Sequence, residues 1–112
     1  MELKELAISD GRIQATRSSL NEFVVTFRDW QEQQWEISFE NVIGVESFNV
    51  EGEELDGIVE EADSDFIDRS RKLAKEPDAL MTCYSFRSPW NEESLMRIVA
   101  TGCEVRKIAG YM

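Results

Sequence analysis

Carboxylates are the most abundant chemically active side chains in this 112-residue sequence. It contains 23 Asp and Glu residues against 12 Lys and Arg residues and no His, which gives a formal net charge of −11. The lack of His excludes His-based acid–base catalysis, the Ser–His and Cys–His nucleophiles and His-containing zinc sites. No spacing marks two acidic residues as the catalytic pair of a glycosidase. We therefore predict a protein that is not an enzyme and uses no cofactor.

The acidic residues at positions 63–68 suggest a cation site, because carboxylate oxygens are the preferred ligands of Ca²⁺. A calcium loop of the EF-hand type has Gly at its sixth position and Glu at its twelfth. Counted from Asp63, these positions hold Asp68 and Ala74. The pattern fails, so we predict that Asp63, Asp65 and Asp68 lie at the start of a helix and bind no metal.

The negative charge is concentrated in one interval of the chain. No Lys or Arg occurs between Arg28 and Arg69, and this interval contains fourteen of the acidic residues. The rest of the chain holds the other nine acidic residues and all twelve basic ones, so its balance is +3. A face of one sign repels nucleic acid and anionic membranes and speeds the encounter with a basic protein. We therefore expect neither a nucleic-acid nor a membrane partner.

The charge pattern favours a binding module that engages a basic protein, such as an inhibitor or immunity-type protein. A charged interval is also typical of a solvated face that keeps a small protein soluble. Trp90 follows Pro89 in a polar loop, where a Trp either anchors an interface or folds back over the end of a barrel. The residues predicted to contact the partner are Glu51, Glu53, Glu54, Asp56, Glu60, Glu61 and Trp90.

Two other functions stay open. Aromatic side chains on one face of a closed sheet either fill a core or enclose a small apolar ligand, because the interior of a small barrel accommodates either. The residues predicted to line such a pocket are Trp35, Phe39, Tyr84 and Phe86. The third possibility is a subunit domain with an exposed apolar patch near Trp90.

Alternating apolar and polar residues predict the strands that must position these side chains. Glu22–Asp29 and Gln33–Phe39 alternate most clearly, and the turn at residues 30–32 pairs their aromatic faces. Asp10-Gly11 is typical of a tight two-residue turn, which predicts an earlier hairpin between Leu6–Ser9 and Arg12–Arg17.

The remaining elements complete an α+β, mainly β domain over residues 1–112. We predict a strand at 45–50, an acidic loop or irregular edge at 51–61, a helix at about 63–75 and strands at 79–86, 94–100 and 103–108. Asp63 or Ser64 caps the helix, Pro77 ends it, and its apolar stripe consists of Phe66, Ile67, Ser70, Leu73 and Ala74. The order βββββ-α-βββ predicts a twisted antiparallel sheet or partly closed barrel of 7–8 strands with the helix packed on it.

The location is expected to be cytoplasmic. The first residues lack the basic start and apolar run of a secretory signal, and no apolar run approaches the length of a membrane span. Cys83 and Cys103 lie in apolar, strand-like surroundings without metal-ligand spacing. We predict that both are reduced and buried, with one disulfide between neighbouring strands as the alternative.

Overall fold

The computed structural model describes residues 1–62, 64–75, 80–90 and 94–108. In these residues the chain forms nine strands, one α-helix and one short 3-10 helix, which confirms the predicted α+β, mainly β class. The elements are η1 (Leu3–Glu5), β1 (Gly11–Ser19), β2 (Glu22–Arg28), β3 (Gln34–Glu40), β4 (Gly44–Ser47), β5 (Glu54–Leu55), β6 (Gly57–Glu61), α1 (Asp65–Ala74), β7 (Thr82–Arg87), β8 (Ser94–Ala100) and β9 (Gly102–Lys107).

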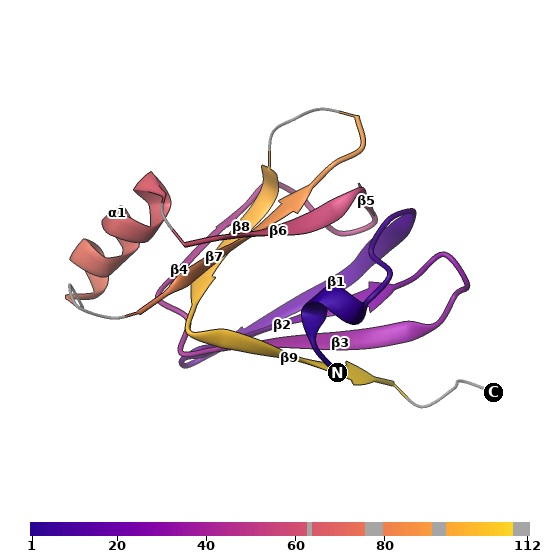
Figure 1. The fold of residues 1–112 in the computed structure, drawn as a ribbon, viewed down its shortest axis with the longest axis horizontal. Helices are drawn as coiled ribbons and strands as arrows, with labels where there is room; N and C mark the ends of the chain where they lie inside the picture. Colours follow the sequence, from indigo (N-terminus) through magenta and orange to yellow (C-terminus); the bar gives the residue numbers. More distant parts are fainter. Residues whose placement is uncertain (63, 76–79, 91–93, 109–112) are drawn as a thin grey trace.

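The strands form two antiparallel sheets around one core (Figure 1). The five-stranded sheet has the order β5-β1-β2-β3-β9, and the four-stranded sheet has the order β4-β8-β7-β6. The chain passes between the sheets from β3 into β4 and from β8 into β9 at one corner, and it also passes from β4 into β5 and from β5 into β6. Such corners join two sheets into a partly closed barrel.

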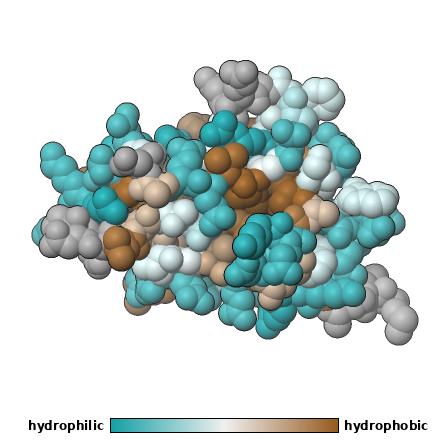
Figure 2. All heavy atoms as spheres, viewed as in Figure 1, coloured by the Kyte–Doolittle hydropathy of each residue, from teal (hydrophilic) through white to brown (hydrophobic). Residues whose placement is uncertain are grey.

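The hairpin of β2 and β3 forms as predicted. Phe23 lies opposite Phe39, Val25 opposite Ile37 and Phe27 opposite Trp35, so the aromatic faces of both strands point to the same side. These side chains join Phe86, Ile98 and Met96 from the other sheet in the main core. Figure 2 shows apolar side chains reaching the surface near the centre of one face, where the sheets separate.

Helix α1 packs on the outer face of the four-stranded sheet. The Ser64 hydroxyl caps it by accepting a hydrogen bond from the Ile67 backbone N–H at 3.2 Å. Phe66 and Ile67 pack with Met81, Cys83 and Val99 in a second apolar cluster.

The predicted apolar stripe of α1 is correct for its first half only. Ser70 is buried, whereas Leu73 and Ala74 are exposed because they lie in the last turn, beyond the cluster that covers the sheet. The helix ends at Lys75 in the left-handed conformation. Asp63 and Pro77 lie outside the described residues.

The predicted hairpin around Asp10-Gly11 is wrong. Residues 6–9 form no strand, because Leu3 in η1 and Leu6 directly after it turn into the core and are buried. A turn does form here, since the Gly11 N–H donates to the Ile8 carbonyl and Asp10 has a positive φ of 67°, but no strand precedes it. The Asp10 backbone N–H donates to the Leu55 carbonyl, which joins the start of β1 to β5. The hairpin partner of β1 is β2.

The segment predicted as a loop or irregular edge, residues 51–61, contains two strands. Leu55 is fully buried and Ile58 packs against the core, so the apolar side chains of this acidic stretch fix β5 and β6 in place. The predicted strands at 45–50 and 79–86 are shorter or shifted. Asn49 has a positive φ of 52° that ends the extended chain, and Leu80 is 89% exposed, outside β7. Strand β8 is central, as predicted.

Candidate functional site

Four of the predicted partner-binding residues gather at one end of the molecule. We call Glu51, Glu53, Glu54 and Asp56 the acidic loop surface. Glu51 and Glu53 lie on the connection from β4 to β5, Glu54 begins β5 beside the start of β1, and Asp56 directly follows β5. Backbone hydrogen bonds from Gly52 N–H to the Ile13 carbonyl (2.7 Å) and from Ile13 N–H to the Glu53 carbonyl (3.1 Å) hold this connection against β1. The surface is therefore built on a sheet edge, not on a free loop.

Most carboxylates of the acidic loop surface have no cationic partner. Glu51 and Asp56 are exposed, and within the described ranges neither they nor Glu53 form an ion pair. Glu54 lies 3.5 Å from the Arg12 guanidinium, which also donates a hydrogen bond to the Gly52 carbonyl. The arrangement leaves a negative surface whose charge is available to a ligand.

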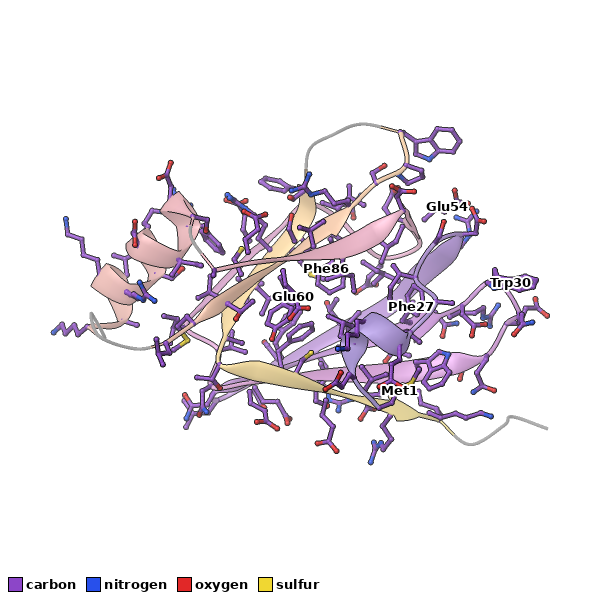
Figure 3. All side chains as sticks on the ribbon, in the orientation of Figure 1. Met1, Phe27, Trp30, Glu54, Glu60 and Phe86 are labelled. Atoms are coloured by element: carbon purple, nitrogen blue, oxygen red, sulfur yellow. The ribbon has the colours of Figure 1, made fainter. Side chains whose placement is uncertain are left out.

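Exposed aromatic residues adjoin the acidic loop surface. Trp90 is 78% exposed and its backbone N–H donates to the Ser88 hydroxyl. The Asp56 backbone N–H donates to the carbonyl of Arg87 at 2.8 Å. Arg87 is the last residue of β7 and precedes Trp90 by three positions, so Asp56 lies close to the loop that carries Trp90. Trp30 is also exposed, and Figure 3 shows it at the same end of the molecule as Glu54.

The other two predicted partner-binding acids lie elsewhere. Glu60 points into a cleft of about 340 Å³ between β6 and β9, which Glu2, Tyr84 and Cys103 also line (Figure 3). Glu61 forms an ion pair with Arg87, 3.4 Å away. The structure thus separates Glu60 and Glu61 from the acidic loop surface.

Several acidic residues of the same interval are engaged in internal contacts. Glu46 on β4 accepts two hydrogen bonds from Arg97, at 2.7 and 2.9 Å, and lies 3.6 Å from Arg69. Both guanidinium groups lie over the Phe66 ring, 4.7 Å (Arg97) and 5.3 Å (Arg69) from its centroid. This ion-pair cluster attaches α1 to the four-stranded sheet. The sequence did not indicate it, because both arginines lie outside the acidic interval.

Asp29 is a further acid with a structural role. Its carboxylate accepts hydrogen bonds from the backbone N–H groups of Gln31 and Gln33 and from the Trp35 indole N–H, all at 2.9 Å. It therefore fixes the β2–β3 turn. The acidic interval divides into residues that hold the fold together and residues that face solvent.

The residues predicted to line an apolar pocket lie in or against the core. Phe39 packs edge-on against Tyr84 and Phe86, with ring centroids 5.0 and 6.0 Å away, and all three side chains are buried. Trp35 is half-buried beside them. The Phe39 ring therefore contacts both of the other two rings.

Burial also governs the ionisable groups in and near this core. It raises the pKa of the Tyr84 hydroxyl and of the Cys83 and Cys103 thiols above their ordinary values. Both cysteines are free, with Cys83 buried and Cys103 half-buried. Neither thiol has the lowered pKa that a nucleophilic cysteine needs.

A cleft of about 630 Å³ lies at the corner where β3 passes into β4. Val42, Ile43 and Met81 supply its apolar wall, and Asn41 donates a side-chain hydrogen bond to Thr101 there. None of the residues predicted to bind a partner or ligand lines this cleft.

The chain matches no protein-family model, no curated protein and no solved structure. Among the described residues, no three candidate metal ligands come together. The described helices are also too short or too polar to cross a membrane.

Proposed function

We propose that this protein is a non-enzymatic, cytoplasmic binding module whose acidic loop surface engages a basic protein, as an inhibitor or immunity-type protein does. The observation that carries the proposal is the combination, at one end of the molecule, of an exposed Trp and carboxylates that have no cationic partner in the part of the chain that the structure describes. The partner would be a protein with a basic, concave surface.

The two kinds of side chain supply complementary contributions to binding. Carboxylates without partners raise the rate of encounter with a basic surface, and this effect weakens as salt is added. Trp is enriched among the residues that carry most of an interface's binding energy, because its large ring buries much apolar area with few rotatable bonds. Trp90 is the best anchor on these grounds, since 78% of it is exposed.

The test is affinity capture with a matched pair of charge-reversed proteins. The immobilised wild-type protein is incubated with lysate of the cells that produce it, washed at low and high salt, and the retained proteins are identified by mass spectrometry. Glu51→Lys/Asp56→Lys alters two exposed acids of the acidic loop surface. Glu22→Lys/Glu40→Lys makes the same charge change at two exposed acids of the five-stranded sheet, which lie opposite each other on β2 and β3.

The proposal predicts a stoichiometric basic protein that elutes with salt. The Glu22→Lys/Glu40→Lys control should retain it, and Glu51→Lys/Asp56→Lys should lose it. Absence of any basic protein from the wild-type column, or equal retention by both variants, would overturn the proposal.

A further inference from the structure

Strand β9 is an edge strand of the five-stranded sheet, and η1 lies beside its first residues. The strand pairs only with β3 among the described strands. The Ile108 backbone N–H donates to the Gln34 carbonyl, and hydrogen-bonded pairs alternate along an antiparallel ladder. By this alternation Glu104 and Arg106 bond to β3, so the N–H and C=O groups of Cys103, Val105 and Lys107 point away from it. No backbone hydrogen bond joins these three residues to another described segment.

The sequence of this edge is complementary to itself. Two β9 strands can pair antiparallel with Val105 of one copy opposite Val105 of the other. In this register Cys103 of each copy lies opposite Lys107 of the other, so the free backbone groups of all three residues face those of the second copy. These pairs exchange about six backbone hydrogen bonds. In the same register Glu104 of each copy lies opposite Arg106 of the other, in the closer, non-hydrogen-bonded pairs that favour cross-strand ion pairs.

Arg106 and Glu104 are available for this contact. Both are exposed. Arg106 donates to Glu36 on β3 at 2.6 Å, and a guanidinium has five N–H donors, so it can bind a second carboxylate at the same time.

The cleft beside β9 supplies a second charge complement. Glu2, Lys4, Glu60 and Cys103 line it, and Lys4 forms an ion pair with Glu2 at 3.2 Å, which leaves Glu60 as the carboxylate of the cleft without an ion pair among the described residues. Lys107 is exposed and likewise has no ion pair there. Residues opposite each other in a sheet point to the same face. Lys107 of a second copy, opposite Cys103, would therefore lie on the side of this cleft that holds Glu60.

We propose that two copies of this chain associate through β9, with Val105 on the two-fold axis, to form one continuous ten-stranded sheet. Strand β5 and the acidic loop surface lie at the opposite edge of the five-stranded sheet from β9. The association therefore leaves both acidic loop surfaces free and keeps their charges at the two ends of the dimer. It does not depend on the proposed function.

The experiment uses charge reversal at the two facing positions. Glu104→Arg places like charges opposite each other at both symmetry-related pairs, and so does Arg106→Glu. Each single variant should weaken the dimer at least about tenfold in sedimentation equilibrium. An equimolar mixture of the two variants should dimerise again, because every facing pair then joins opposite charges. Within one chain, the double variant Glu104→Arg/Arg106→Glu should also dimerise.

Controls separate this contact from general charge effects. Arg17→Glu and Glu22→Arg, exposed on β1 and β2 of the same sheet, should leave the association unchanged. Circular dichroism checks that each variant is folded. A wild-type protein that stays monomeric up to about 1 mM would overturn the proposal, as would a mixture that associates no better than its components. Partner capture by the acidic loop surface should not change in the β9 variants.

Discussion

The acidic loop surface and the cluster around Glu46 come from the same base-free interval of the sequence, yet their carboxylates have opposite surroundings. Glu46 is held between Arg97 and Arg69, and both guanidinium groups stack on Phe66. Glu51 and Asp56 face solvent, without an ion pair in the part of the chain that the structure describes. Charge density in a sequence therefore does not show which acids are available for binding.

The difference follows from topology. Strand β4 lies beside β8, which brings Arg97 opposite Glu46, and α1 adds Arg69 from above. The connection from β4 to β5 lies instead at the end of the sheets, beside β1, where Arg12 is the neighbouring cation. Acids with arginine partners stabilise the fold, whereas acids without them supply the field that attracts a basic partner.

The largest effect is expected from a change beneath α1, where the Glu46 cluster attaches the helix. A Cβ at Gly44 would lie 2.9 Å from the Ser70 Cβ and in contact with its hydroxyl oxygen, so Gly44→Ala must push the helix outward. We expect a loss of about 2–3 kcal/mol in unfolding free energy, measured by urea denaturation. An unchanged unfolding free energy would mean that the packing of α1 adds little to stability. The Glu46 cluster would then have no structural role to set against the acidic loop surface.

A matched pair of isosteric substitutions tests the contrast directly. Glu46→Gln removes the negative charge that accepts the hydrogen bonds of Arg97. Because the side chains of Glu46 and Arg97 are each less than one-third exposed, the substitution should lower the unfolding free energy by about 1–2 kcal/mol. Glu51→Gln removes an exposed charge without a described partner and should change stability by less than about 0.5 kcal/mol. Equal effects in urea denaturation would contradict the division into structural and available acids.

Alkaline pH should weaken the core through its buried thiols and phenol. The pKa values of Tyr84, Cys83 and Cys103 are raised in the folded protein, so the unfolded chain releases these protons first as the pH rises. Stability is therefore retained at neutral pH. It falls above about pH 9, where first the thiols and then the phenol of the unfolded chain lose their protons. Thermal unfolding between pH 7 and 10 measures it. Cys83→Ala/Cys103→Ala should reduce the slope near pH 9.

The smallest expected effect is that of salt. Because the acidic loop surface is self-repulsive, added NaCl should raise the Tm, by less than about 4 °C. Glu51→Lys/Asp56→Lys should show a smaller rise. A Tm that falls with salt in both proteins would show that ion pairs such as Glu46–Arg97 outweigh the repulsion.

Residue patterns predicted the regular parts of this fold well. The alternation in residues 22–39 predicted that the two strands pair with their aromatic faces together, and the structure places Phe23 opposite Phe39. Asp10-Gly11 misled in part, since a turn forms there but the burial of Leu3 and Leu6 keeps residues 6–9 out of a strand. The high charge of residues 51–61 hid two strands that Leu55 and Ile58 fix.

The candidate site was predictable only in part. Glu51 to Asp56 are neighbours in the chain, so their gathering follows from the sequence. The separation of Glu60 does not, since it depends on the passage of β5 into β6 between two sheets. The ion pairs of Glu46 with Arg97 and Arg69 also join residues far apart in the sequence, and no local pattern reveals them.

The most direct test of the acidic loop surface is the rate at which the protein associates with its captured basic partner, measured by stopped-flow fluorescence at several salt concentrations. We predict that the association rate constant falls steeply with salt. Glu51→Lys/Asp56→Lys should slow association at low salt and flatten this dependence, while Glu22→Lys/Glu40→Lys should behave much more like the wild type. Equal association rates and salt slopes for the two variants would contradict a binding role for the acidic loop surface.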